Sequence, residues 1–405
     1  AYEGGIVCRT TNCTLDLDHV TVHALEGSAL QAESGTITIN GGEYKSNQGA
    51  AIATSLNLDD NLDLTINGGT YQNDNYNWPV ANFGCYVGRN GRDCNIKIHG
   101  GTFVGGQLLW FHGEGAETLT IDGNTTLQST GGEYDAVVVG GHGQLFFNSG
   151  TIDISDGSER NALRIVERGE AIVNDGTFKG AKYDIYERNN DSRVSPCRVQ
   201  LNHANFDDSV CNVYLEKDRQ IDVAQNYTGE VTIECADPSD GRQLTKATET
   251  DYQKNLNLTS ANEGYLVGYK KTADGKEYRC LSKKVGVTIN GLKGEIKAED
   301  PAEFTVTLTH AGSTGTGTLT FGDKNGEIEY KDENDKYVPM PNDGLPIKLA
   351  SDKNDYAFRI TPKDAGEQKL TAAVVRDDVE LGTAEENFTV AGRVHTTVTI
   401  EGLEN

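Results

Sequence analysis

The chain has 405 residues, and its 61 acidic side chains outnumber its 36 basic ones, which gives a formal net charge of -25. This charge argues against nucleic-acid phosphates or an anionic membrane surface as the main partner, and no apolar run approaches the roughly 18 residues that a membrane span needs. The length suffices for two or three hydrophobic cores. We therefore expect several domains, no nucleic-acid partner and no membrane insertion.

A repeated motif runs through the first half of the chain. It is plainest in ITINGGEYKS (37–46), LTINGGTYQN (64–73) and IKIHGGTFVG (96–105), and weaker copies begin at residues 119, 145, 171 and 199. The polar residue before the glycines recurs every 23 to 32 residues, at Asn40, Asn67, His99, Asp122, Asn148, Asn174 and Asn202. Four positions later comes a mostly aromatic column: Tyr44, Tyr71, Phe103, Thr126, Ile152, Phe178 and Phe206. Each unit predicts a strand and a bend. Because one unit cannot bury its own apolar face, the spacing predicts a parallel β-helix with the aromatic column inside.

A second column of alternating apolar residues predicts another strand in each turn. It includes QLLWFHG (107–113), ALRIVERG (162–169), YDIYERNN (183–190) and CNVYLEKD (211–218). The charged pairs that we align at one position are Glu167–Arg168, Glu187–Arg188 and Glu216–Lys217. Stacked on three turns, they would form either a solvated salt-bridge network or a charged strip that binds carboxylate or sulfate groups. Arg164 would add to this strip, and the strand exits of earlier turns carry Arg89, His112 and, beside it, Trp110.

The longest turn contains the segment QNDNYNWPVANFG (72–84). An insertion on a solenoid forms a loop on one face, often the binding face. Its large flat side chains, Tyr76, Trp78 and Phe83, suit either sugar stacking or a protein hot spot. The alternative is that Trp78 folds back over the side of the helix as a plug.

These turns resemble secreted right-handed parallel β-helix proteins of the pectin-lyase-like superfamily, and most of all adhesin-type surface proteins of Gram-positive gut bacteria. The resemblance covers residues 1–235. Such proteins often end the helix with a Gly-Tyr-x-Val and Asp-Gly hairpin, to which residues 264–267 and 274–275 are similar. The resemblance therefore implies a C-terminal cap over residues 236–284.

The pattern changes after residue 284. Residues 285–392 contain β-alternating stretches separated by turn signals, which is the spacing of a β-sandwich, and they resemble a bacterial Ig-like domain. GVTINGLKG (286–294) recurs as TVTIEGLEN (397–405), so residues 393–405 are expected to begin a second, truncated Ig-like repeat. We expect an all-β monomer that is part of a longer multidomain surface protein.

The eight cysteines fall into near pairs: Cys8 and Cys13, Cys85 and Cys94, Cys197 and Cys211, Cys235 and Cys280. Their spacing does not match a structural metal site. An even number in neighbouring pairs favours disulfides and a secreted or cell-wall-anchored protein, with buried free thiols as the alternative. The connectivity itself is a hypothesis, because eight cysteines can pair in many ways.

The resemblance and the aromatic loop predict a non-catalytic protein that recognises a host glycoprotein, such as immunoglobulin or mucin, or a glycan. No catalytic residues and no cofactor are assigned. The alternative is a calcium-dependent polysaccharide lyase or glycoside hydrolase of the same superfamily, in which carboxylates could bind calcium. The acidic groups available for that role are Asp16 with Asp18, and Asp59 and Asp60 with Asp63. A third possibility is a structural spacer that exposes no aromatic loop.

Overall fold

The computed structural model describes residues 5–8, 13–54, 61–75, 77–85, 94–115, 117–157, 159–188, 195–207, 211–249, 251–309, 313–349 and 353–393. They form two compact units. The first contains the described residues up to Pro238 together with Gln243–Glu263 and Lys271–Arg279. The second contains Ser239–Arg242, Gly264–Lys270 and the described residues from Cys280 onward. Within the described part of the chain, no helix is both long and apolar enough to cross a membrane.

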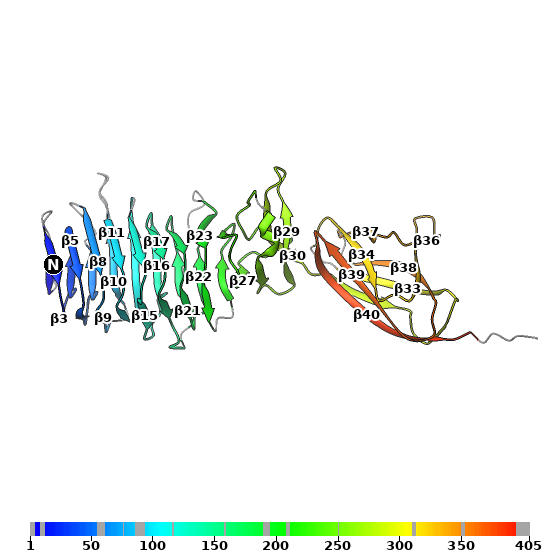
Figure 1. The fold of residues 1–405 in the computed structure, drawn as a ribbon, viewed down its shortest axis with the longest axis horizontal. Helices are drawn as coiled ribbons and strands as arrows, with labels where there is room; N and C mark the ends of the chain where they lie inside the picture. The colour runs from blue at the N-terminus through cyan, green and yellow to red at the C-terminus, as the bar shows by residue number, and fades with distance from the viewer. Residues whose placement is uncertain are drawn as a thin grey trace, which may run out of the picture. The chain divides into compact units, whose positions relative to one another are not determined.

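The first unit is a solenoid of three parallel sheets, as the repeats predict (Figure 1). Sheet A has eleven strands: β1 (Ile6–Cys8), β4 (Leu30–Ala32), β7 (Ile52–Thr54), β10 (Pro79–Cys85), β13 (Gln107–Gly113), β16 (Val137–Gly141), β19 (Leu163–Ile165), β22 (Tyr183–Glu187), β25 (Cys211–Leu215), β27 (Glu230–Cys235) and β28 (Asn257–Ser260). Sheet B has nine: β2 (Thr14–Leu17), β5 (Gly35–Ile39), β8 (Leu62–Ile66), β11 (Cys94–Ile98), β14 (Thr118–Ile121), β17 (Gln144–Phe147), β20 (Glu170–Val173), β23 (Cys197–Leu201) and β26 (Gln220–Val223). Sheet C has eight: β3 (Val20–Ala24), β6 (Gly42–Ser46), β9 (Thr70–Asn73), β12 (Thr102–Gly105), β15 (Thr126–Ser129), β18 (Thr151–Asp153), β21 (Thr177–Lys179) and β24 (Asn205–Asp207).

Each repeat motif spans a strand of sheet B, the corner that follows it and a strand of sheet C. The aromatic column lies inside sheet C: Tyr71 stacks on Tyr44 with ring centroids 5.2 Å apart, and Phe103 stacks on Tyr71 at 4.5 Å. One member of the column was assigned wrongly. Leu127, not Thr126, pairs with Phe103 and is buried, because this turn has one more residue at its corner than the motif assumes.

The repeated polar residues form hydrogen-bonded ladders along the corner between sheets B and C. The Asn67 amide donates to Asn40 (2.8 Å), and Asn40 donates to the Asp16 carboxylate (2.7 Å). In later turns Asn202 donates to Asn174 (2.6 Å), which donates to Asn148 (2.7 Å). A side-chain amide carries both a donor and an acceptor, so identical residues on successive turns satisfy one another. The repeated polar position therefore fixes the register of neighbouring turns.

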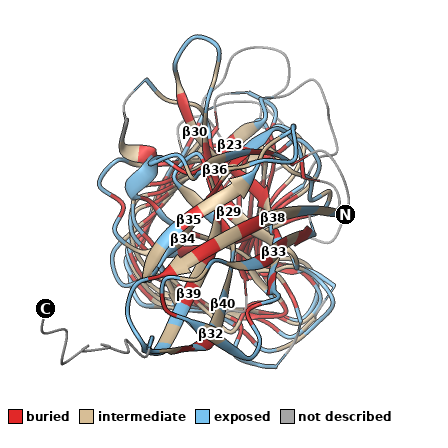
Figure 2. Ribbon diagram, turned by 90° about the vertical axis from the view of Figure 1, so that its right-hand side faces the viewer, coloured by how far each residue is buried: buried red, intermediate tan, exposed pale blue. Residues whose placement is uncertain are grey.

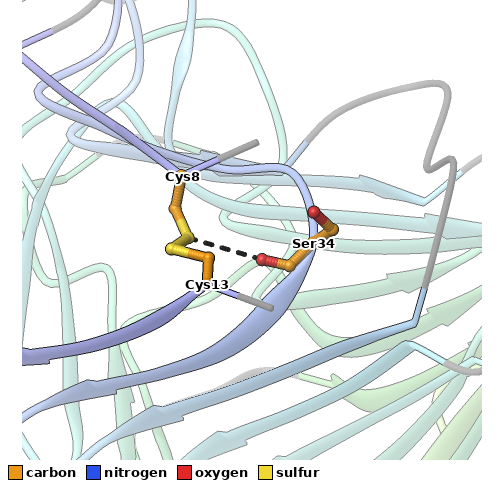
Figure 3. Close-up of a disulfide and its surroundings, with 3 residues drawn as sticks. All are labelled: Cys8, Cys13 and Ser34. Atoms are coloured by element: carbon orange, nitrogen blue, oxygen red, sulfur yellow. Dashed lines mark hydrogen bonds between the residues drawn. A yellow bond between two sulfur atoms is a disulfide. The ribbon is translucent and has the colours of Figure 1, made fainter. Parts of the chain in front are cut away.

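The cysteines agree with the expected pairing only in part. Cys8 and Cys13 form a disulfide in the first turn, and Cys8 Sγ lies 3.5 Å from the Ser34 carbonyl oxygen (Figure 3). The predicted pairs Cys197–Cys211 and Cys235–Cys280 are wrong in this structure, because Cys197, Cys211 and Cys280 are free thiols. Cys197 lies in sheet B and Cys211 in sheet A, on different faces of the solenoid. Cys85 ends β10, but its side chain lies outside the described residues, so its pairing with Cys94 stays a prediction.

After β27 the chain continues through a 3-10 helix (Asp251–Asn255), then β28, and then a hairpin of β29 (Tyr265–Lys271) and β30 (Glu277–Lys283). The turn of this hairpin contains Gly275 at a φ of 86°, a conformation that glycine adopts without strain. The hairpin matches the one expected from the resemblance, and the division at residues 236–284 stays a prediction.

The second unit contains two five-stranded sheets. The first is β31 (Gly286–Asn290), β33 (Ala302–Thr309), β38 (Lys353–Pro362), β35 (Gly326–Lys331) and β36 (Tyr337–Pro339). The second is β32 (Glu295–Lys297), β40 (Val379–Ala391), β39 (Gly366–Arg376), β34 (Thr316–Gly322) and β37 (Leu345–Lys348). Buried residues alternate with more exposed ones along β33 and β38 (Figure 2). Val306 and Phe358 of one sheet and Leu319 and Val374 of the other belong to one buried core. The proposed second repeat lies, from residue 394 onward, outside the described residues.

A buried ion pair holds the segment Ser239–Arg242 within the second unit. Arg376 donates through Nη1 to Asp240 Oδ2 (2.8 Å) and through Nη2 to Oδ1 (2.6 Å). The backbone N–H groups of Lys283 and Thr314 also donate to this carboxylate, each at 2.9 Å. Although burial alone would raise it, the hydrogen bonds from Arg376 and these amides hold the pKa of Asp240 well below its ordinary value.

Candidate functional site

Exposed large hydrophobic side chains, two of them aromatic, lie at the corner between sheets C and A, which we call the C–A corner. Three large hydrophobic side chains are exposed among the described residues: Leu25 (67%), Trp78 (47%) and Tyr134 (47%). Leu25 follows β3, Trp78 precedes β10, and Tyr134 lies between β15 and β16. All three therefore belong to C–A connections of different turns. Trp78 and Tyr134 are aromatic, and exposed aromatic rings are typical of binding surfaces.

Two hollows lie along this corner and share its connections. The first, of about 430 Å³, which we call the Trp78 hollow, is lined by Glu26, Gly27, Ser28, Gln31, Gln48, Gly49, Ala50, Trp78 and Asn82. The second, of about 480 Å³, which we call the Tyr134 hollow, is lined by Asn47, Asp74, Asn75, Asn77, Gly132, Glu133 and Tyr134. Asn47 and Gln48 are sequence neighbours, as are Asn77 and Trp78. The two hollows therefore flank the same two connections.

The connection that carries Trp78 is held by the side chain of Asn73, which is buried at the end of β9. Asn73 accepts a hydrogen bond from the N–H of Asn75 (2.6 Å) and donates to the Trp78 carbonyl (3.0 Å). The N–H of Asn77 donates to the Asn75 side chain (3.0 Å). The hydrogen bonds between backbone groups of neighbouring strands stop at the corner, and these side-chain hydrogen bonds take their place. They hold the backbone on either side of the corner, and so fix the position from which Trp78 projects.

The lining of both hollows is amide-rich and acidic. Among the described residues, neither lining contains a lysine or arginine, whereas each contains a glutamate. Lys45, which is close by, is already paired with Asp74 at 2.8 Å. Aromatic rings beside amide and carboxylate groups can stack on an apolar face and hydrogen-bond to hydroxyl groups. This chemistry suits a neutral, hydroxyl-rich ligand better than an anionic one.

The residues of the predicted aromatic loop separate in the structure. Trp78 is exposed at the C–A corner, which agrees with its expected position on the surface. Phe83 is wrong as a ligand-binding residue, because it lies in β10, pairs with Phe111 and is fully buried in the core. The loop is shorter than expected, since β10 begins at Pro79. Tyr76 and Arg89 lie outside the described residues.

The predicted charged ladder is also wrong in its register. Glu187 pairs with Ile165 and Leu215, which places it at an inward position, and it is fully buried. Its Oε1 accepts a hydrogen bond from Arg198 Nε at 3.2 Å. Burial raises the pKa of Glu187 to about 7, against the opposing effect of Arg198. Glu187 is therefore part of the interior and not of a surface strip, while Arg188 next to it is exposed.

Four other predicted residues lie within strands of sheet A or just after them. Trp110 stacks on His112 with ring centroids 5.4 Å apart. His112 Nε2 lies 2.8 Å from Glu167 Oε2, which also accepts a hydrogen bond from the N–H of Gly141 (2.8 Å). Arg168 donates to His142 Nε2 (3.0 Å). These contacts link side chains of different turns of the solenoid.

Arg164 belongs to an outward row of sheet A that continues with Tyr186 and Tyr214, two residues that were not predicted as site residues. Its guanidinium donates to Asp135 (2.9 Å) and lies 5.9 Å from the centre of the Tyr186 ring. Tyr186 stacks face to face on Tyr214 at 4.9 Å, and its hydroxyl donates to Glu216 (2.6 Å). The tyrosine faces cover one another, so this row stabilises the sheet and offers a ligand little free ring surface.

The acidic groups considered for calcium are only partly described. Asp16 accepts from Asn40, and Asp63 accepts from Asn95 at 3.3 Å, so both take part in contacts between turns. Within the described residues, no group of three or more His, Cys, Asp or Glu side chains is arranged to hold a metal ion. Asp59 and Asp60 lie outside the described residues.

No known family model matches the chain, and neither does any curated protein sequence. A function can therefore be proposed only from the fold and from the residues of the C–A corner. Sequence reasoning missed Tyr134, although one signal was available: STGGEYD (129–135) is a polar, glycine-rich insertion with a single aromatic residue between two apolar strands.

Proposed function

We propose that the chain is a non-catalytic surface or secreted binding protein whose β-helix recognises a glycan or a host glycoprotein, such as immunoglobulin or mucin, at the C–A corner. The observation that carries this proposal is the position of Trp78 and Tyr134. Both rings are about half exposed, and each borders a hollow lined with amides and carboxylates. A solenoid commonly places its binding surface on the face that receives the insertions.

The rest of the chain is consistent with an extracellular role. The Cys8–Cys13 disulfide is typical of proteins that fold in an oxidising compartment. We propose that the β-helix is right-handed and that the second unit is an Ig-like domain acting as a stalk for the binding head of an adhesin-like, monomeric surface protein. The two facing sheets around one core support this assignment of the second unit.

The proposal is tested with the whole chain immobilised and exposed to mucin, immunoglobulin, and neutral and acidic polysaccharides. Retention and cleavage are measured in the same wells, with calcium and with a chelator. We expect retention without cleavage, and Trp78→Ala should weaken it about 30-fold, as for a residue that contributes about 2 kcal/mol to binding. Leu25→Ala is the matched control, since it removes an exposed side chain from the same corner but lines neither hollow.

Two results would contradict the proposal. Calcium-dependent cleavage would favour the lyase or hydrolase alternative. An equal loss of retention in the Trp78 and Leu25 variants would mean that the Trp78 hollow is not the binding site.

A further inference from the structure

The Tyr134 hollow exists because one C–A connection is almost absent. β12 ends at Gly105 and β13 begins at Gln107, so a single glycine makes this corner. The connections on either side are longer: residues 74–78 precede β10, and residues 130–136 precede β16. Two projecting connections with a tight corner between them leave a notch, and the Tyr134 hollow occupies it.

A buried arginine holds the far wall of this notch in place. Arg160 is only 5% exposed, and its Nη1 donates to the carbonyls of Gly106 (2.8 Å) and Tyr134 (2.7 Å). Its Nη2 donates to the hydroxyl of Ser129 and to the Asp156 carboxylate (2.9 Å). A buried guanidinium is costly unless its donors are satisfied. Arg160 thus ties the tight corner to the connection that presents Tyr134.

We infer that the C–A corner binds one extended neutral oligosaccharide across both hollows, with Trp78 between them and Tyr134 forming a second sugar subsite that Arg160 positions. This inference rests on the proposed glycan-binding function and names its ligand class. Both hollows are lined by residues 47–50 and by the described residues of the connection before β10, which are Asp74, Asn75, Asn77 and Trp78, so a single chain of sugars can contact both. Sugar hydroxyl groups both donate and accept, which matches side-chain amides and carboxylates.

The charge of the corner excludes acidic sugars from this role. Glu133 and Glu26 line the hollows, Asp74 is already paired with Lys45, and the described lining residues include no cation to neutralise a sulfate or carboxylate. An anionic group placed there would face like charges and lose its hydration without a compensating partner. A neutral sugar meets neither cost.

The test is an array of neutral oligosaccharides, each printed at two lengths beside its sulfated and sialylated counterparts and probed with the full chain. We expect neutral forms to bind better than their charged counterparts, and longer forms better than short ones. Tyr134→Ala should lower affinity for the longer forms about three- to tenfold, the usual range for one aromatic contact, and leave the short forms unchanged. Arg160→Lys should give the same length-specific loss, whereas a general structural defect would reduce binding of both lengths.

The outcomes separate this inference from the proposed function. Preferential binding of the charged counterparts, or equal effects of Tyr134→Ala on both lengths, would overturn the inference and leave glycan binding standing. Absence of binding to any member by the wild-type chain would overturn both. Leu25→Ala again serves as the control for an exposed side chain outside the hollows.

Discussion

Removing either partner of the Asp240–Arg376 pair should strongly destabilise the second unit. The two side chains are 1% and 6% exposed, and Asp240 accepts five hydrogen bonds, two of them from Arg376. Asp240→Ala leaves a buried guanidinium without its counter-ion, which costs about 3–5 kcal/mol. The double variant with Arg376→Met removes both charges, so its cost should fall below the sum of the single changes by about 2–3 kcal/mol.

The assay follows unfolding by far-UV circular dichroism and by tryptophan fluorescence. Both tryptophans, Trp78 and Trp110, lie in the solenoid, so a transition seen by circular dichroism alone reports the second unit. The exposed pair Lys369–Glu385 (3.0 Å) is the control, and its removal should leave the unfolding midpoint almost unchanged, because water screens exposed ion pairs. Additive single effects at Asp240 and Arg376, or costs as small as the control, would refute the reasoning.

The pair also predicts a pH dependence with a definite sign. The folded-state pKa of Asp240 lies below its unfolded value. The pair therefore adds stability above about pH 4 that is lost as the pH falls through the folded pKa. Asp240→Ala should make the second unit less sensitive to acid.

Two further predictions concern the solenoid. Because burial raises the pKa of Glu187 from 4.5 to about 7, the folded state disfavours its ionised form, and stability relative to Glu187→Gln should fall by about 3 kcal/mol as the pH rises through this window. Urea unfolding at pH 5 and pH 8 measures it, and a pH-independent difference would contradict it. Asn174→Ala breaks two ladder bonds, one with Asn148 and one with Asn202, and should cost about 1–3 kcal/mol. A urea midpoint unchanged from wild type would show that the ladder adds nothing to stability.

The repeats predicted the solenoid because a few residues in each turn determine how that turn pairs with its neighbours. Each turn places an asparagine or another polar residue at the B–C corner and a large apolar residue soon after it. Tyr71 and Phe103 were placed correctly inside sheet C by this rule. The rule failed at Leu127, where one extra corner residue shifts the strand by one position and so exchanges the inward and outward faces.

The same sensitivity explains the errors in the candidate site. Glu187 pairs with Ile165 of the neighbouring turn and not with Glu167, so the predicted alignment of the two glutamates is wrong by two residues. Pairs that match by eye in the sequence are therefore apart in the structure. Phe83 was assigned to a loop because its segment is long, yet the strand β10 takes up its second half. Arg160 contacts the carbonyls of both Gly106 and Tyr134. These three residues belong to different turns, so no single repeat motif contains this arrangement.

The central claim, that a glycan or glycoprotein binds beside Trp78, can be measured directly because the chain has only two tryptophans. In Trp110→Phe the fluorescence reports Trp78 alone, and in Trp78→Phe it reports Trp110 alone. Each variant is titrated with the glycoprotein or oligosaccharide that the immobilised chain retains best. The account predicts a saturable shift in the emission of Trp110→Phe and none in Trp78→Phe. A shift confined to Trp78→Phe, or no retained ligand at all, would contradict it.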